Sequence, residues 1–320
     1  EPVRSTYYSL QYFADKATSP LINFSESIVI GGFWRSGTTI LMKLLGEASK
    51  GKTVFEPLHP NCPNYAELYP NFDKNTLKIY HPLPDESIFN QKMGTIFLKD
   101  CLTGNVSSSW TRRERQSIWK SLRTRTVVKT VRGSLLLPLL EETFGIWPIY
   151  ILRDPRSVVA SITRKNWGQF LENLSLKKCF LTLPSCRENF FTKYQEIINE
   201  HENRSLESRI SLMYAILISS WRDISSTNTQ FVSYENLIVN PQETLKPIID
   251  QLNLKSSLSS SSILSRETST TSYGRQGSSK NERLFGWKDE LSKKTIEEIE
   301  AIFQKIGLEE IMYDPGKSSL

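Results

Sequence analysis

One stretch near the start of the chain, residues 28–45, constrains the fold more than any other. It begins with a short β-branched run, Ile28-Val-Ile30, of the kind that forms a buried parallel strand. A glycine-containing loop follows, and apolar residues then recur at helical spacing over 40–45. A strand, a tight loop and a helix in this order point backbone N–H groups and a helix N-terminus at an anion. The stretch therefore predicts a phosphate-type site in an α/β fold.

The loop differs at one position from the motif that binds nucleotide triphosphates. Gly32 and Gly37 have the spacing of GxxxxGK[ST], but Thr38 stands where that motif has lysine. That lysine reaches the outer phosphates of a triphosphate, whereas the cation of this loop is Arg35. The pattern favours a smaller or less charged anion. The residues expected to bind this anion are the loop residues Arg35, Ser36, Gly37, Thr38 and Thr39.

The rest of the chain alternates short apolar strands with helices. Further strands are expected at 52–56, 126–130, 147–152 and 230–233, and helices at 135–144, 155–162, 189–202, 208–224, 241–252 and 292–306. A basic helix is expected over 111–123, with Thr111 as its N-cap and Glu114 completing a capping box. The alternation predicts a single α/β domain with a P-loop-type central parallel sheet flanked by helices on both faces.

Several segments lack clear periodicity. Residues 1–26 are expected to form an N-terminal lead-in packed on a domain that extends over 27–315. Segments 57–110 and 165–205 are expected to be excursions that shape a substrate pocket. The Ser/Thr-rich segment 255–283 is expected to be a mobile loop.

Composition limits the class of protein. The net charge of +6 is dispersed over 320 residues, which argues against a nucleic-acid-binding surface. No stretch approaches the roughly 20 apolar residues of a membrane helix. We expect a soluble, cytoplasmic chain if it is complete, and a Golgi-lumen protein if an N-terminal anchor was removed. Cys179 and Cys186 either form a local disulfide or remain reduced thiols, and none of the four cysteines has metal-ligand spacing.

A second anion site is predicted after the strand at 147–152. Arg153 stands at the carboxyl end of that strand, where ligands bind in open α/β sheets. Ser161 follows eight residues later on the next helix, so its hydroxyl can face the same anion. The alternative is that Arg153 and Asp154 form a structural ion pair. Two anion sites on neighbouring strand ends predict a ligand with two separated anionic groups.

These motifs resemble the sulfotransferases that use 3′-phosphoadenosine 5′-phosphosulfate (PAPS). Arg35-Ser-Gly-Thr-Thr39 looks like the family's 5′-phosphosulfate loop, and Leu152-Arg-Asp-Pro-Arg-Ser-Val-Val-Ala-Ser161 looks like its 3′-phosphate motif. The segment Phe231-Val-Ser-Tyr-Glu-Asn-Leu237 is similar to the family's Tyr-Glu-Asp-Leu segment. Glu282-Arg-Leu-Phe-Gly-Trp287 is a looser match.

The resemblance implies roles for particular residues. Arginine in the first loop and Glu56, about twenty residues on, are similar to the Golgi carbohydrate and protein-tyrosine sulfotransferases and related bacterial enzymes. Glu56 is therefore the candidate general base for the acceptor hydroxyl. Arg35 and Lys129 are the candidate cations that stabilise charge on the leaving phosphate oxygen. The alternatives are a surface carboxylate for Glu56 and a surface lysine for Lys129.

The resemblance also implies the ligands. PAPS is the expected cofactor, adenosine 3′,5′-bisphosphate (PAP) its product, and no metal is required. Tyr234 and Trp34 are candidates for contact with adenine, and Arg275 for closing over the 3′-phosphate. The acceptor is a hydroxyl on a carbohydrate, a small alcohol or phenol, or a tyrosine.

Two other functions remain as alternatives. A P-loop kinase or other nucleotide phosphotransferase is disfavoured by the missing lysine and by the lack of a convincing magnesium ligand other than Asp154. A polyanion-binding module without catalysis predicts clustered Lys and Arg, but these residues are dispersed.

Overall fold

A computed structural model describes most of the chain. The described residues are 2–106, 108–115, 117–164, 171, 174–181, 189–225, 228–254 and 279–315, with side chains from residue 7 onward. Arg275, Cys186 and most of the expected mobile loop lie outside the described residues.

The described strands form a five-stranded sheet in the order β2-β3-β1-β4-β5, and every neighbouring pair is parallel. The strands are β1 (Ile28–Gly32), β2 (Lys52–Phe55), β3 (Thr126–Lys129), β4 (Pro148–Leu152) and β5 (Gln230–Ser233). All five lie within two residues of the ranges that the sequence predicts. Because every strand runs in the same direction, their carboxyl ends share one edge of the sheet.

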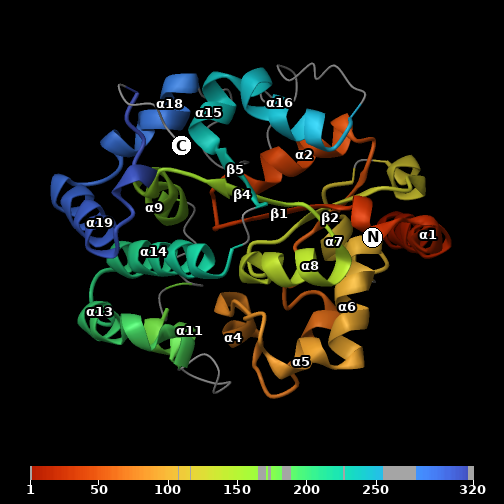
Figure 1. The fold of residues 1–320 in the computed structure, drawn as a ribbon, viewed down its shortest axis with the longest axis horizontal. Coiled ribbons are helices and arrows are strands. Elements are labelled where there is room, and N and C mark those ends of the chain that lie inside the picture. Colours follow the sequence, from red (N-terminus) through yellow and green to blue (C-terminus); the bar gives the residue numbers. More distant parts are fainter. Residues whose placement is uncertain are drawn as a thin grey trace.

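Helices cover both faces of this sheet (Figure 1). One face carries α2 (Thr38–Ala48), α15 (Tyr234–Val239) and α16 (Pro241–Gln251). The other carries α8 (Leu137–Phe144), α9 (Pro155–Arg164) and α14 (Leu206–Ile224). The predicted fold class, a P-loop-type central parallel sheet flanked by helices, is confirmed.

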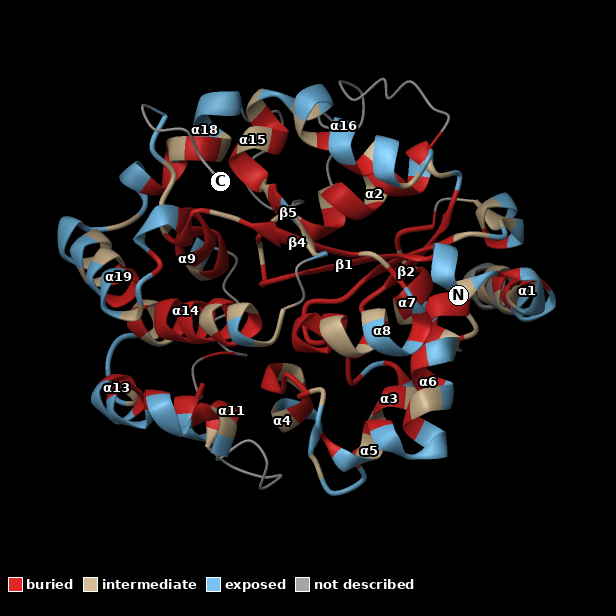
Figure 2. Ribbon diagram, in the orientation of Figure 1, coloured by how far each residue is buried: buried red, intermediate tan, exposed pale blue. Residues whose placement is uncertain are grey.

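The two faces have separate hydrophobic cores. Ile28 and Ile30 of β1 pack in the core that contains α2, whereas Val29 packs in the core that contains α14. This alternation follows from the two-residue period of a strand. Figure 2 shows the buried residues concentrated along the sheet and on the inward sides of its helices. A strand buried on both faces reads as a continuous apolar run, which is why β1 was recognisable from its sequence.

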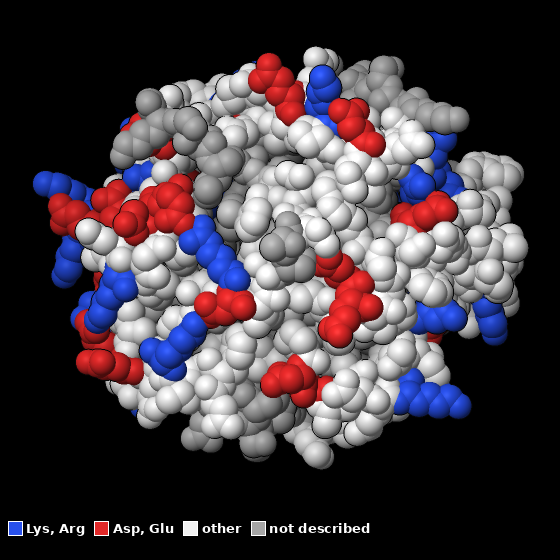
Figure 3. Space-filling model, in the orientation of Figure 1, with Lys and Arg blue, Asp and Glu red and all other residues white. Residues whose placement is uncertain are grey.

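Outer helices surround this core. The excursion 57–110 contains α3 (Pro63–Ala66), α4 (Lys74–Ile79), α5 (Ser87–Asn90), α6 (Lys92–Thr103) and the start of α7 (Ser109–Arg112). Later come α11 (Leu176–Phe180), α13 (Gln195–His201), α18 (Lys280–Phe285) and α19 (Lys293–Ile306). None of the described helices combines the length and apolarity needed to cross a bilayer. On the face shown in Figure 3, basic and acidic side chains are interspersed.

The prediction of a basic helix over 111–123 was wrong. The segment instead holds the four-residue α7 and a 3₁₀ helix, Ile118–Leu122. Ser108 rather than Thr111 caps α7, and the Thr111 hydroxyl donates to the carbonyl of Ser108. Long-range ion pairs of Arg112 and Arg115 hold this segment in its observed path, and local propensity could not reveal them.

Those ion pairs attach the N-terminal helix α1 (Pro2–Thr18) to the sheet. The buried carboxylate of Asp15 accepts from Arg112 Nε at 2.7 Å and from Arg115 Nη1 at 2.5 Å, and it lies 3.6 Å from Lys52 Nζ. Burial lowers the pKa of Lys52 to about 8. Arg115 Nε also donates to the Thr53 carbonyl of β2 at 2.7 Å. A single carboxylate thus balances three buried cations between α1 and the edge of the sheet.

Replacing Asp15 should therefore destabilise the whole fold. Asp15→Ala leaves these cations without a counter-charge, and the free energy of unfolding should fall by about 3 kcal/mol or more. Glu26→Ala, which removes an exposed pair with Arg125 and an exposed hydrogen bond from Asn23, should cost less than about 1 kcal/mol. Urea unfolding followed by circular dichroism measures both. Equal midpoints for Asp15→Ala and the unsubstituted protein would contradict this role.

Candidate functional site

The loop between β1 and α2 can form only with glycine at its two ends. Gly32 has φ +152° and Gly37 has φ +99°. A Cβ on Gly32 would lie 2.8 Å from the Ile151 carbonyl oxygen, and one on Gly37 would lie 2.3 Å from Tyr234 Cδ2. Arg35 between them also has positive φ, +64°. The loop is therefore a tight turn against β4 and α15.

The N-terminus of α2 is open toward this loop. Gly37 is its N-cap, and no described side chain caps the helix. The first N–H groups of a helix lack partners within it. Thr38 and Thr39 begin α2 and are buried. The geometry is that of an anion cradle at a helix N-terminus.

The two predicted anion sites are in direct contact. Arg35 Nε donates to Ser161 Oγ at 2.9 Å, and Arg153 Nη1 donates to the Arg35 carbonyl at 2.8 Å. The structure thus joins the loop, the end of β4 and helix α9, although 126 residues separate Arg35 from Ser161. Burial, with the charges of Arg153 and Arg164 nearby, lowers the pKa of Arg35 to about 10, so the side chain stays cationic at neutral pH.

Arg153 is held by several contacts that leave one donor open. Its Nη2 donates to the Arg283 carbonyl at 3.2 Å, and its guanidinium lies 4.2 Å from the centre of the Tyr234 ring. The Tyr214 hydroxyl accepts from the Arg153 backbone N–H at 3.1 Å and donates to its carbonyl at 2.9 Å. Arg153 Nε is buried and has no hydrogen-bond partner among the described residues.

Asp154 has a structural role. It pairs with Arg156 (Nη2 to Oδ2, 2.6 Å), and it accepts the backbone N–H of Tyr313 at 2.9 Å. The alternative of an Arg153–Asp154 ion pair is therefore wrong, because the partner is Arg156. These bonds occupy the carboxylate that a kinase would need for magnesium. Among the described residues, no three His, Cys, Asp or Glu side chains form a group that could hold a metal ion.

Glu56 lies at the carboxyl end of β2 in a strained backbone conformation, with φ +46°. Its side chain is buried and forms an ion pair with Lys129, whose strand neighbours β2. The Val131 backbone N–H donates to Glu56 Oε2 at 3.1 Å, and Arg132 Nη1 lies 3.8 Å from the same oxygen. Burial lowers the pKa of Lys129 and of Arg132, while the Glu56 carboxylate opposes that shift.

His59 is a weak base in this environment. Its ring stacks on Trp110 at 4.0 Å, and its Nδ1 accepts the Asn61 backbone N–H. Burial, followed by the charges of Arg132, Arg113, Lys129 and Lys78, lowers the pKa of His59 to about 2. The imidazole is therefore neutral at working pH and has little affinity for a proton.

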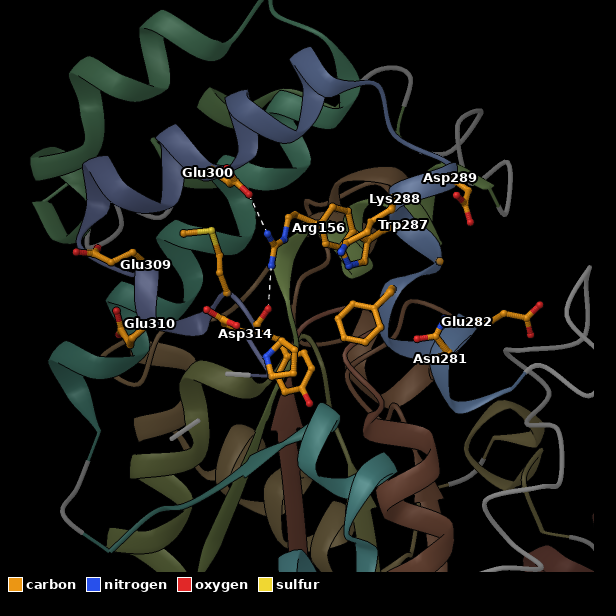
Figure 4. A pocket seen from close by; sticks show the side chains of 15 residues that line it. Arg156, Asn281, Glu282, Trp287, Lys288, Asp289, Glu300, Glu309, Glu310 and Asp314 are labelled. Carbon is orange, nitrogen blue, oxygen red and sulfur yellow. Dashed lines mark hydrogen bonds and ion pairs between the residues drawn. The ribbon is translucent and has the colours of Figure 1, made fainter. Parts of the chain in front are cut away.

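A separate cleft of about 1330 Å³ opens beside Arg156, between α18 and the end of the described chain. Figure 4 shows Arg156 inside it, next to Trp287 and paired with Glu300. None of the predicted site residues lines this cleft.

Comparison with known proteins decides the family. A profile of the "Sulfotransferase family" matches residues 27–257. The chain belongs to the sulfotransferase family. The expected family and enzyme class are thereby confirmed. A search of curated proteins gave no match.

Several solved structures match this chain at low identity. The sulfotransferase domain from the curacin biosynthetic pathway is 16% identical, with 88% of this chain and 97% of that chain covered and a TM-score of 0.44. Mouse sulfotransferase SULT7A1 complexed with PAP is 12% identical, with coverage of 90% and 87% and a TM-score of 0.44. Retinol dehydratase in a complex with retinol and PAP is 14% identical, with coverage of 88% and 81% and a TM-score of 0.42.

The structure places most predicted residues of this sulfotransferase along one sheet edge. Glu56 follows β2, Lys129 ends β3, the loop follows β1, Arg153 follows β4 and Tyr234 follows β5. Tyr234 is buried between Gly37 and Arg153, whereas Trp34 lies near His81, with 5.9 Å between ring centres.

Sequence reasoning missed Arg132 and Tyr214. Arg132 stands three residues beyond Lys129, and this position after a predicted strand was an available signal. Tyr214 lies within the buried helix α14, where nothing in the sequence distinguishes it from a core tyrosine.

A buried carboxyl beneath the Arg153 site makes stability depend on pH. Glu235 Oε1 accepts the Asp154 backbone N–H at 3.0 Å, and burial together with the Asp154 charge raises the pKa of Glu235 to about 7. Between its unfolded value, about 4.5, and pH 7 the folded protein binds more protons than the unfolded chain. This group therefore makes the folded state less stable as pH rises through that window.

Glu235→Gln should remove this dependence and keep the acceptor oxygen for Asp154. Measured by urea unfolding, the variant's free energy of unfolding minus that of the unsubstituted protein should rise by roughly 2 to 3 kcal/mol from pH 5 to pH 8. Taking this difference cancels the other titrating groups. Parallel stability curves for the two proteins would contradict the assignment.

Proposed function

We propose that this enzyme moves the sulfuryl group of PAPS to an acceptor hydroxyl by in-line displacement, with Glu56 as general base. The observation that carries the proposal is the hydrogen bond between Arg35 Nε and Ser161 Oγ at 2.9 Å. It joins the predicted 5′-phosphosulfate loop to the predicted 3′-phosphate motif. A single ligand with two separated anionic groups can therefore contact both.

The described residues fit such a ligand. The α2 N-terminus with Thr38 and Thr39 offers N–H and hydroxyl donors for one anionic group. Arg153, whose buried Nε has no described partner, and Ser161 offer donors for the other. Tyr234 packs against Gly37 of the loop and against Arg153, so it contacts both sets of donors. Residues 255–278, including Arg275, lie outside the described residues.

PAPS supplies the sulfuryl group when bound. Arg35 and Lys129 are the cations that would stabilise charge developing on the leaving oxygen, because they flank the end of β1 from the loop and from β3. Lys129 is buried, which strengthens its electrostatic effect on a neighbouring anion.

Glu56 would accept the proton of the acceptor hydroxyl. In the structure Lys129 and the Val131 backbone N–H hold its carboxylate in one orientation. Lys129 and Arg132 are the cations nearest to this carboxylate among its ion pairs. The acceptor is a hydroxyl on a carbohydrate, a small alcohol or phenol, or a tyrosine, and the excursions 57–110 and 165–205 would shape its pocket.

Calorimetric titration with PAP, and separately with ATP plus Mg²⁺, tests whether the protein binds a nucleotide with two separated anionic groups. We expect PAP to bind without metal and Arg153→Ala to weaken it by about tenfold or more, because a charged hydrogen bond is lost. Arg204→Ala, which removes an exposed arginine paired with Glu200, is the control and should bind PAP normally. Binding of ATP with Mg²⁺ but not of PAP would overturn the proposal in favour of a kinase.

Glu56→Gln should lower kcat by about 10² to 10⁴ while the Kd for PAP stays close to its original value, because an amide cannot take the proton of the acceptor hydroxyl. The substitution also removes the counter-charge of Lys129 and Arg132. Glu56→Asp keeps the counter-charge for Lys129 and should fold normally, but its shorter side chain should also lower kcat. Release of PAP in the presence of an acceptor gives the rates. Full activity of Glu56→Gln would exclude Glu56 as the base.

A further inference from the structure

Basic and aromatic side chains gather beside Glu56 at the outer edge of the sheet. We call His59, Trp110, Arg113, Lys129 and Arg132 the edge cluster. Strand β2 is the edge strand, and α7, which carries Trp110, packs beside it (Figure 1). Adjacent strands are about 4.8 Å apart, so the end of β2 lies roughly 10 Å from the end of β1. Trp110 and Arg113 of the edge cluster therefore come from the β2 side of the proposed base, away from the proposed cofactor residues on β1, β4 and β5. Lys129 and Arg132 come from the end of β3, between β2 and β1.

Phe55, the residue before Glu56, connects the members of this cluster. Its ring centre lies 4.0 Å from the Arg113 guanidinium and 4.4 Å from Lys129 Nζ. The Arg113 guanidinium also lies 4.2 Å from the ring of Trp110, whose indole stacks on His59. Arg113 is thus fixed beside the residue that precedes Glu56.

Positive charge exceeds negative charge at this place. The Glu56 carboxylate is shared by Lys129 and Arg132. Among the described residues, the ion pair of Arg113 is a loose one, with its Nε 3.7 Å from Glu114 Oε1, and the other oxygen of Glu114 pairs with Lys43 at 2.9 Å. Partly buried cations without a close counter-charge are unfavourable, so such a cluster favours an anionic ligand.

Two buried N–H donors of the edge cluster have no hydrogen-bond acceptor among the described residues. Arg113 Nε and Trp110 Nε1 are both buried, and neither makes a hydrogen bond with any described residue. Buried donors usually have a partner, and two neighbouring exceptions call for an explanation. An anionic oxygen placed against Arg113 and Trp110 would satisfy both donors and offset the excess charge.

We propose that the acceptor itself is anionic and that Arg113 and Trp110 bind its carboxylate or sulfate ester while its hydroxyl faces Glu56. This inference rests on the proposed function and adds the substrate class. Arg113 acts as a specificity residue. Arg113 lies on the β2 side of the proposed site. The sulfuryl group that is transferred would instead lie at the loop after β1.

Matched acceptor pairs test the proposal. PAP release from PAPS is measured with methyl glucuronide and its carboxamide, with 4-hydroxyphenylacetate and its amide, and with galactose 6-sulfate and galactose. The first two pairs probe a carboxylate and the third probes a sulfate ester. We expect kcat/KM to favour the anionic members by about tenfold to a hundredfold, as a charged hydrogen bond provides. Arg113→Gln should bring this ratio close to one, mainly through KM, and Arg113→Lys should retain part of it.

Arg125→Gln is the control. The Arg125 side chain is 25% exposed, close to the 26% of the Arg113 side chain, and it pairs with Glu26, away from the edge cluster. It should keep the full preference. Equal kcat/KM for both members of every pair, a preference that survives Arg113→Gln, or no sulfation of any acceptor by PAP-binding protein would each overturn the inference. Failure to bind PAP, measured first, would instead reject the proposed function.

Discussion

The structure depends on the close approach of backbone at the carboxyl end of β1. This central strand ends in a loop that lies against β4 and α15 with no space for a side chain at Gly32 or Gly37. The tightness brings the loop next to Arg153, which donates to the Arg35 carbonyl, and it lets Arg35 reach Ser161. The proposed anion site therefore depends first on packing, and its charged side chains are placed by a geometry that the glycines permit.

The sheet provides the second level of organisation. Its strand order separates the proposed cofactor residues, which follow β1, β4 and β5, from the proposed base, which follows β2. Lys129 on β3 stands between these groups, paired with Glu56 and next to β1. The parallel sheet thus sets the order of the proposed site residues along its carboxyl edge.

Sequence reasoning succeeded where local pattern and global structure agree. The buried strands are continuous apolar runs, and the order of the two anion motifs was visible from the residues around Arg35 and Arg153. It failed where distant partners decide the path. The 111–123 segment has a helical pattern, but Asp15, about a hundred residues away, holds Arg112 and Arg115 in a different conformation. Whether Glu56 and Lys129 are surface or buried groups could likewise be decided only once the two strand ends were seen side by side.

Helix α1 affects where this protein can be cut into fragments that fold. The family profile begins at residue 27, which would suggest that a fragment starting there is a complete folding unit. Such a fragment would lack Asp15, the carboxylate that pairs with Lys52, Arg112 and Arg115 at the edge of β2. Division at the profile boundary would therefore separate these three cations from a counter-charge that α1 supplies. A fragment intended to fold by itself should include α1.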